Sequence, residues 1–229
     1  MGRKRNNFVL SEWKGISYIR SKPFKMNQTD ATIKTADIFG MAANRSKILR
    51  SLLSPFLPDP KNRECMQRVD TAFRQWLYTE PLNLQMPVDA IPFFNGLSFN
   101  EQNELKQLFK IPVTTNRQTN GQLQFHIPAF DPLKDIKAPD GTKQVLITIA
   151  AAAMQIDNPS IQDYYKKELS IAYVPGTINP QDIAIPVETA RGRLSVVALA
   201  MQYFTDDNGH ASVDQLKWKP AGIVGSFYN

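Results

Sequence analysis

The chain has 229 residues, 42% of them hydrophobic and 21% charged, which is typical of a globular protein and excludes a fully disordered one. A single cysteine, Cys65, excludes an intrachain disulfide. The longest apolar run, residues 145–154, is about half as long as a membrane-spanning helix, so we expect no membrane span.

The net charge of +6 is unevenly distributed, because residues 1–75 contain 15 Lys or Arg against 6 Asp or Glu, and residues 76–229 contain 12 against 15. This asymmetry indicates either a basic arm that faces an acidic partner or a solvated basic face without one. No long apolar segment follows the basic start, so we expect no cleaved secretory signal and synthesis in the cytoplasm. Incorporation into a particle and export by a non-classical route both stay open.

Residues 1–28 are predicted to form an extended basic arm, because Gly15, Pro23 and clustered polar residues oppose a helix. Residues 16–20 have the β-branched and aromatic composition of a strand. Basic and aromatic residues alternate here, and the candidate interaction residues are Arg3, Lys4, Arg5, Trp13, Lys14, Tyr18, Arg20, Lys22 and Lys25. Such residues bind phosphates and stack on bases, or else the arm packs on the fold or on a neighbouring subunit.

Two helices are predicted within residues 29–81. The first covers about residues 29–53, with Thr29 or Asp30 as its cap and Pro55 just beyond its end. Its apolar residues are Ile33, Ala36, Phe39, Ala43, Leu49, Leu52 and Phe56, with a polar gap at residues 44–47. The second begins at Asp59 and Pro60. Its apolar stripe is Met66, Val69, Phe73, Trp76 and Leu77. Both stripes need a partner surface, either the β region or another subunit.

Residues 82–229 are predicted to form an antiparallel β-sandwich, because prolines separate many short apolar runs. Residues 123–127 and 169–173 alternate apolar and polar side chains, and the dipeptides at 120–121 and 208–209 are the Asn-Gly of hairpin turns. Residues 100–109 and 160–167 have a helix-like composition, and residues 216–219 alternate like a strand.

An internal similarity occurs at an offset of 47 residues, where residues 147–155 (ITIAAAAMQ) align with residues 194–202 (LSVVALAMQ). This offset predicts a duplicated β unit, and chance similarity of Ala-rich strands is the alternative. Residues 145–156 and 193–204 are apolar on both faces, as strands are in the centre of a covered sheet. Their alanines leave room for the predicted helices or mark a subunit contact.

We predict no catalytic residue, no cofactor and no metal site, and therefore no enzyme. The two histidines, His126 and His210, have no second ligand at metal-binding spacing, and no base accompanies Cys65 in the local sequence. Residues 206–209 resemble the start of a calcium loop but lack its alternating ligands, so a β-turn is expected there.

Residues 11–23 (SEWKGISYIRSKP) resemble the opening of an uncharacterised bacterial family of domain-of-unknown-function proteins, which carries W-K-G-x-x-Y-[IV]-R-S-x-P. The matching residues are Trp13, Lys14, Gly15, Tyr18, Ile19, Arg20, Ser21 and Pro23. Residues 223–228 (IVGSFY) are similar to that family's closing strand, and the middle of the chain aligns loosely. The resemblance implies helices followed by a β-rich half, and no known activity.

The predicted fold class is therefore α+β: a basic arm at residues 1–28, a helical pair at 29–81 and a β-sandwich at 82–229. The predicted function is that of a non-enzymatic structural subunit in a homomeric filament, shell or phage-like particle. One alternative is a nucleic-acid-associated protein that binds through residues 1–75. Another is a carbohydrate- or surface-binding sandwich with Trp13, Trp76 or Trp218 exposed for stacking.

Overall fold

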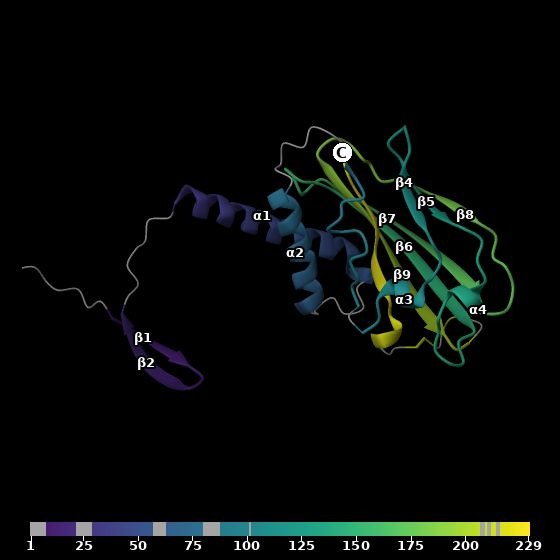
Figure 1. Cartoon of the computed structure of the whole chain (residues 1–229), viewed down its shortest axis with the longest axis horizontal. Helices are drawn as coiled ribbons and strands as arrows, with labels where there is room; N and C mark the ends of the chain where they lie inside the picture. Colours follow the sequence, from purple (N-terminus) through teal and green to yellow (C-terminus); the bar gives the residue numbers. More distant parts are fainter. Residues whose placement is uncertain are drawn as a thin grey trace, which may run out of the picture. The chain divides into compact units, whose positions relative to one another are not determined.

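The structure, a computed structural model, describes residues 8–21, 29–56, 63–79, 88–100, 102–206, 209, 212–213 and 216–229. The chain divides into two compact units, Met1–Asp37 and Ile38–Asn229. The predicted α+β class is confirmed, since the described residues combine helices with three antiparallel sheets of two, five and three strands (Figure 1). The helix α1 (Asp30–Leu53) begins in the first unit and continues in the second.

The first unit contains a β-hairpin formed by β1 (Phe8–Trp13) and β2 (Ile16–Ser21). The strand predicted at residues 16–20 is confirmed, and the pairing shows that this part of the arm folds back on itself. The hairpin turn consists of Lys14 and Gly15, whose φ angles of 52° and 77° are both positive, as a type I′ turn requires. Thr29 caps α1, as predicted, because its hydroxyl accepts a hydrogen bond from the Thr32 amide at 3.2 Å.

A five-stranded sheet forms the centre of the second unit. Its strands, in spatial order, are β3 (Val88–Asp89), β10 (Ala221–Tyr228), β9 (Arg193–Phe204), β6 (Gln144–Gln155) and β7 (Gln162–Ala172). The two long apolar runs become β6 and β9, which are neighbours in the interior of the sheet and are buried on both faces. The prediction of two central strands is confirmed.

Helices cover one face of this sheet. The C-terminal half of α1 and the helix α2 (Arg63–Thr79) share a buried cluster with the small side chains Ala150, Ala152 and Ala198. The α2 residue Trp76 packs edge-on against Phe94 and against Tyr228 of β10, at ring centroid distances of 5.8 and 5.3 Å. The prediction that the alanines leave room for the helices is therefore confirmed for these three residues, whereas Ala151 and Ala153 face the other side of the sheet.

The buried stripe of α2 was predicted largely correctly, whereas that of α1 was not. Phe39 is 54% exposed, and the buried α1 residues are Ala42, Ser46, Leu49 and Leu53. Sequence patterning treated residues 44–47 as a polar gap, but Ser46 is fully buried and hydrogen-bonds to Asp70 of α2. Arg50 completes this junction with an ion pair of 2.6 Å to the same carboxylate, so a polar contact fixes the packing of the two helices.

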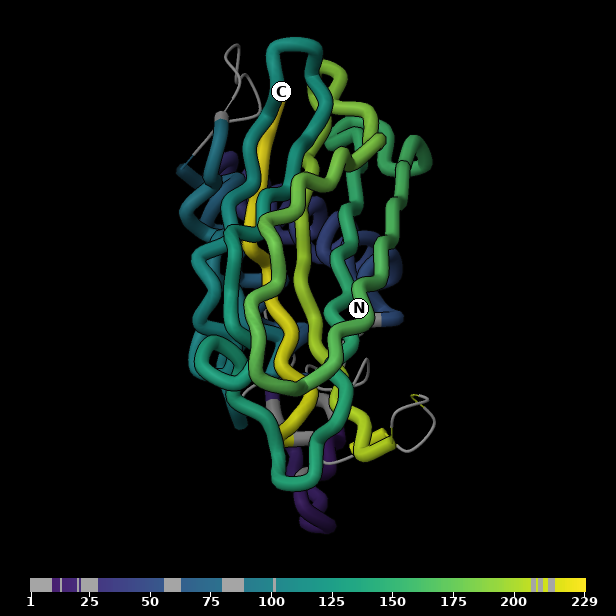
Figure 2. Tube along the Cα trace, turned by 90° about the vertical axis from the view of Figure 1, so that its right-hand side faces the viewer, coloured from purple at the N-terminus to yellow at the C-terminus, as the bar shows by residue number. Residues whose placement is uncertain are grey.

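A three-stranded sheet faces the other side of the central strands (Figure 2). It consists, in spatial order, of β4 (Thr114–Arg117), β5 (Leu123–Ile127) and β8 (Gln181–Ile185). The predicted alternation is confirmed in β5, where Leu123, Phe125 and Ile127 are buried and join a cluster with the odd-numbered residues of β6 and β9. Gly121, with a φ of 82°, lies in the predicted turn between β4 and β5.

Three local predictions differ from the structure. Residues 160–167 are not helical, because β7 pairs with β6 from Gln162 to Ala172 and its polar side chains face solvent at the edge of the sheet. Residues 100–109 contain only the single turn α3 (Leu105–Leu108). Residues 216–219 are not a strand, since Leu216–Trp218 forms the 3₁₀ turn η2. The described ranges exclude the predicted cap at Asp59 and Pro60, and also Asn208.

The two similar runs, residues 147–155 and 194–202, occupy neighbouring strands, but their equivalent residues face opposite sides of the sheet. β6 and β9 pair antiparallel with Thr148 opposite Ala200, so opposed partners have numbers of equal parity. An offset of 47 changes parity, and Ile147 therefore lies in the core beneath the small sheet whereas Leu194 lies in the core beneath the helices. Both runs are mostly apolar, apart from Thr148, Ser195 and the glutamine that ends each run, which allows either orientation.

A close contact between β10 and β4 gives a test of how the two sheets pack. A Cβ atom on Gly225 would lie 2.8 Å from both Cβ and Oγ1 of Thr115. We expect Gly225→Ala to lower the free energy of unfolding by about 1–3 kcal/mol through overpacking, as measured by urea denaturation. In the same chain, Thr115→Gly should recover part of this loss, because it removes both contacting atoms.

The matched control is Gly40→Ala in α1, where the described part of the chain has no heavy atom within 4 Å of the added methyl group apart from the local helix backbone. That substitution should raise the free energy of unfolding by about 1 kcal/mol, since alanine is the better helix former. If Gly225→Ala lowers the free energy of unfolding by the same amount whether residue 115 is threonine or glycine, the described contact is contradicted.

Candidate functional site

The β1–β2 hairpin carries the most exposed aliphatic side chains among the described residues. Leu10, Ile16 and Ile19 are 72%, 69% and 70% exposed, and Tyr18 is half-exposed. Leu10 lies opposite Ile19, so the two share one face of the hairpin, while Ile16 and Tyr18 are on the other. We call these four side chains the hairpin surface.

This surface has a physical reason to seek a partner. A hairpin of two strands is only marginally stable alone in water, and it gains stability when an apolar face is covered. Each Leu or Ile side chain that becomes buried contributes about 1.5–3 kcal/mol. Residues 1–37 also contain eight Lys or Arg against three Asp or Glu, so the apolar hairpin belongs to a strongly cationic segment.

The structure places four of the nine predicted interaction residues on this hairpin. Lys14 is in the turn, Tyr18 is on β2, and the backbones of Trp13 and Arg20 pair with those of Ile16 and Val9. The described residues do not include the other five, Arg3, Lys4, Arg5, Lys22 and Lys25. Sequence reasoning missed Leu10 because β1 was not predicted, although the Lys-Gly dipeptide between two apolar segments was the available signal.

Two of the three tryptophans proposed for stacking on carbohydrate have other contacts. Trp76 is 2% exposed in the helix-side core, which corrects the prediction that it is available to a ligand. Trp218 packs edge-on against Tyr203 at a ring centroid distance of 6.0 Å, on the side of the sheet opposite Trp76. The carbohydrate alternative therefore loses Trp76 as a stacking platform.

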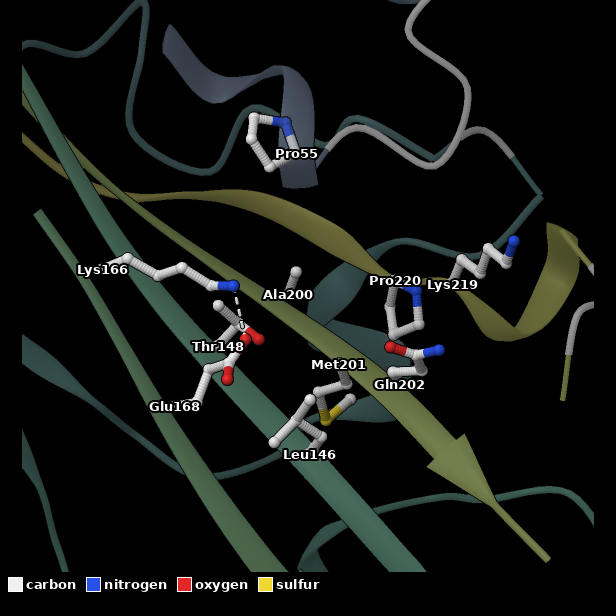
Figure 3. Close-up of a pocket in the computed structure, with 10 residues that line it drawn as sticks. All are labelled: Pro55, Leu146, Thr148, Lys166, Glu168, Ala200, Met201, Gln202, Lys219 and Pro220. Atoms are coloured by element: carbon white, nitrogen blue, oxygen red, sulfur yellow. Dashed lines mark ion pairs between the residues drawn. The ribbon is translucent and has the colours of Figure 1, made fainter. Parts of the chain in front are cut away.

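A pocket of about 250 Å³ opens on the part of the helix-side face that the helices leave uncovered (Figure 3). Leu146, Thr148 and Ala200 come from the central strands, Pro55 follows α1, and the remaining lining residues are Lys166, Glu168, Met201, Gln202, Lys219 and Pro220. Lys166 and Glu168 form an ion pair of 2.5 Å at the rim, and both are nearly half-exposed. The pocket thus offers one internally neutralised pair together with hydroxyl and amide groups, and we assign no reaction to it.

On the other face of the sheet, a buried arginine of β9 links this strand to β7. The Arg193 side chain is 2% exposed, and its Nη1 lies 2.5 Å from Asp163 Oδ2 and 3.0 Å from Glu188 Oε2. It also donates to the Glu188 carbonyl at 3.1 Å. Two carboxylates and a carbonyl compensate the buried charge, and the cluster holds Asp163 in place.

The hydroxyls of one buried and one partly buried tyrosine donate hydrogen bonds in the same unit. Tyr203 donates to the Lys137 carbonyl at 3.0 Å, and Tyr173 donates to the Ile136 carbonyl at 2.9 Å. Burial raises the pKa of both hydroxyls above the usual value for tyrosine. Because the folded-state pKa is raised, this contribution to stability is complete below about pH 10 and is lost as the pH rises further.

The described ranges contain neither a metal-binding cluster nor a membrane-spanning helix. No cluster of three or more His, Cys, Asp or Glu side chains there is suited to a shared metal ion. His126 Nδ1 lies 2.9 Å from Asp182 Oδ1 on the small sheet, and His210 is outside the described residues. None of the helices in those ranges combines the length and the apolar character needed to cross a bilayer.

These observations define a class by architecture: a mixed α+β chain whose five-stranded antiparallel sheet has helices on one face and a smaller antiparallel sheet on the other. Comparisons with protein-family models, with curated proteins and with solved structures each found no match. The function is therefore inferred from the surfaces of the chain itself.

The turn of the hairpin provides a test of the candidate site. Lys14 has a φ of 52°, a conformation that costs a non-glycine residue about 1–2 kcal/mol and that asparagine adopts more readily. We expect Lys14→Asn to increase the hairpin population and Gly15→Val to reduce it. The measurement is the strength of cross-strand NMR contacts between Leu10 and Ile19 in the labelled full chain, and Glu12→Gln is the control. Equal contacts in Gly15→Val and in the original chain would contradict the described turn.

Proposed function

We propose that this chain is a non-enzymatic structural subunit of a homomeric assembly, such as a filament, a shell or a phage-like particle. The observation that carries the proposal is the hairpin surface, where Leu10, Ile16 and Ile19 are each more than two-thirds exposed. The N-terminal unit joins one copy to another by burying this surface against a neighbouring subunit.

The energetics support this role. Covering the face that carries Leu10 and Ile19 buries two aliphatic side chains, which supplies about 1.5–3 kcal/mol each. The covered hairpin is also more stable than it is alone. The excess of cationic residues in the same unit favours an acceptor with acidic side chains at its rim. In this reading the pocket beside Lys166 and Glu168 has no catalytic role.

We also infer that the second unit is a β-sandwich, because the inner faces of its two sheets share one buried cluster. The similarity of residues 147–155 to 194–202 supports a duplicated β unit, and the opposite facing of Ile147 and Leu194 argues against two copies in equivalent environments. Membership of the W-K-G-x-x-Y family stays a proposal based on the sequence motif, whose residues 13–21 form the end of β1, the turn at Lys14 and Gly15, and β2.

Self-association of the full chain tests the assembly proposal. Light scattering after size-exclusion chromatography, and sedimentation over a wide concentration range, should show oligomers. We expect the double substitution Leu10→Ser with Ile19→Ser to weaken association at least about tenfold, which corresponds to a loss of about 1.4 kcal/mol. The loss follows from two aliphatic side chains that no longer gain from burial.

The matched control is Leu133→Ser, which removes a comparably apolar side chain, 43% exposed, from the other unit. It should leave association unchanged. A chain that is monomeric at every concentration contradicts the assembly function, and an equal loss in Leu133→Ser contradicts the role of the hairpin surface.

A second candidate function is nucleic-acid binding through the basic N-terminal third. The observation that favours it is the excess of five basic residues in residues 1–37, together with the half-exposed Tyr18 on the same unit. Lys and Arg neutralise phosphates, and an exposed aromatic ring stacks on an unpaired base.

Fluorescence anisotropy with labelled single-stranded and duplex DNA tests this candidate. If it is correct, affinity falls at least about tenfold between about 50 and 200 mM salt, because bound counterions are released. Deletion of residues 1–25 should abolish binding, and Tyr18→Ala should weaken binding to the single strand more than to the duplex. Affinity that survives the deletion would remove the arm from this role.

A further inference from the structure

The strand β7 is an eleven-residue edge strand. It lies at the end of the strand order in the five-stranded sheet and pairs with β6 from Gln162 to Ala172 (Figure 2). The Tyr173 amide donates to Lys143 on the β6 side, and the direction of the backbone groups alternates along a strand. The N–H and C=O groups of the even-numbered residues 162–172 therefore point away from β6. Such a row of groups is a template for another strand.

We propose that β7 pairs antiparallel with β7 of a second copy, with Tyr165 opposite Tyr165 at a two-fold axis. The two five-stranded sheets then form one continuous sheet across the dimer. This inference rests on the proposed assembly function and names one of its interfaces, which is separate from the hairpin surface.

Side-chain complementarity selects this register. With Tyr165 at the axis, Asp163 lies opposite Lys167 of the second copy, and Ile161 lies opposite Leu169. On the other face, Tyr164 lies opposite Lys166, which suits a cation–π contact. Gln162 lies opposite Glu168, so no like charges meet anywhere along the strand. These pairs each recur twice because of the symmetry.

The geometry of single residues supports the same pairing. Ile161 is 47% exposed and Leu169 is partly buried against the core, so the pair extends the apolar interior across the axis. The Arg193 side chain and the Glu188 amide both bind Asp163 through Oδ2, which leaves Oδ1 as the acceptor for Lys167 of the second copy. Asp163 is therefore held in position before the partner arrives.

Neighbouring registers are less favourable. An axis at Lys167 or at Lys166 places two lysines directly opposite each other. An axis at Tyr164 leaves Lys167 opposite Ile161 and gives Asp163 no basic partner. An axis between two residues opposes an even residue to an odd one, so outward-pointing backbone groups meet inward-pointing ones and cannot bond. The charges at residues 166–168 oppose several edge contacts and favour the register with Tyr165 at the axis.

Disulfide trapping tests the register directly. The substitution Tyr165→Cys, in a Cys65→Ala background, places two thiols at a non-hydrogen-bonded pair whose Cα atoms are about 4.5 Å apart, within the range that a disulfide spans. The matched control Leu169→Cys is on the same strand and the same face, but the two copies of this position are about 26 Å apart in the proposed dimer. After mild oxidation of the full chain, we expect a covalent dimer for Tyr165→Cys and none for Leu169→Cys. Adding Ile161→Cys to Leu169→Cys should restore the cross-link.

A second variant tests the β7 pairing independently, in case Tyr165→Cys does not fold. Lys166→Pro removes an outward-pointing N–H and leaves the ladder to β6 intact, as proline on an edge strand can. We expect it to weaken dimerisation at least about tenfold, whereas Lys166→Ala should change it less than about threefold. Circular dichroism confirms the fold of each variant.

The outcomes separate this inference from the assembly function. If the chain self-associates but Tyr165→Cys does not cross-link, if Leu169→Cys cross-links equally well, or if Lys166→Pro associates like the original chain, the β7 pairing is overturned and the assembly function stands. If the chain is monomeric at every concentration, the assembly function itself is overturned, and the pairing with it.

Discussion

The fold depends on the pairing of β6 with β9, two long strands that are buried on both faces. Their ladder extends from Gln144 opposite Phe204 to Gln155 opposite Arg193. A strand pair without a polar face cannot leave either side in water, so both sides of the sheet must be covered. Side-chain size decides what covers each one. Ala150 and Ala152 allow α1 and α2 to approach closely, whereas Ile147 and Ile149 meet the inner face of β4, β5 and β8.

The two edges of this sheet differ in how the rest of the chain covers their backbone groups. Along β10, backbone bonds from residues 90–99 bind the outer groups, as in the donation from Gly96 N to the Ile223 carbonyl at 2.9 Å and from Phe99 N to the Ala221 carbonyl at 2.8 Å. At the other edge β7 ends the strand order, and charged and aromatic side chains occupy residues 163–168. The asymmetry directs sheet extension to one side of the molecule.

The net charge is also unevenly distributed between the two units of the chain. Residues 38–229 contain 19 Lys or Arg and 18 Asp or Glu, so nearly all of the net charge belongs to the N-terminal unit. Long-range attraction through that unit weakens with salt, because exposed charges are screened beyond about 10 Å at 0.1 M. Contacts through β7 depend instead on backbone bonds and on locally matched side chains, which salt affects less. Ionic strength therefore distinguishes the two surfaces.

The sequence by itself determined the features that depend on local composition. Uninterrupted apolar runs can only be buried strands or helices, which identified β6 and β9. Proline and a capping threonine located α1, and Asn-Gly located the turn between β4 and β5. One strand of the candidate site, β2, was also predictable, since residues 16–20 have strand composition.

Only the tertiary structure decided which surfaces are covered. Ser46 was predicted to interrupt the helical stripe, yet it is buried, because Asp70 of α2 and Arg50 on the next turn of α1 both hydrogen-bond to its hydroxyl. Residues 160–167 read as a polar helix, yet they become β7 because β6 supplies a partner strand and solvent accepts the outer face. Leu10 and Ile19 are aliphatic, yet both side chains are exposed. A local pattern records how apolar a residue is, but the element that covers it comes from a distant part of the chain.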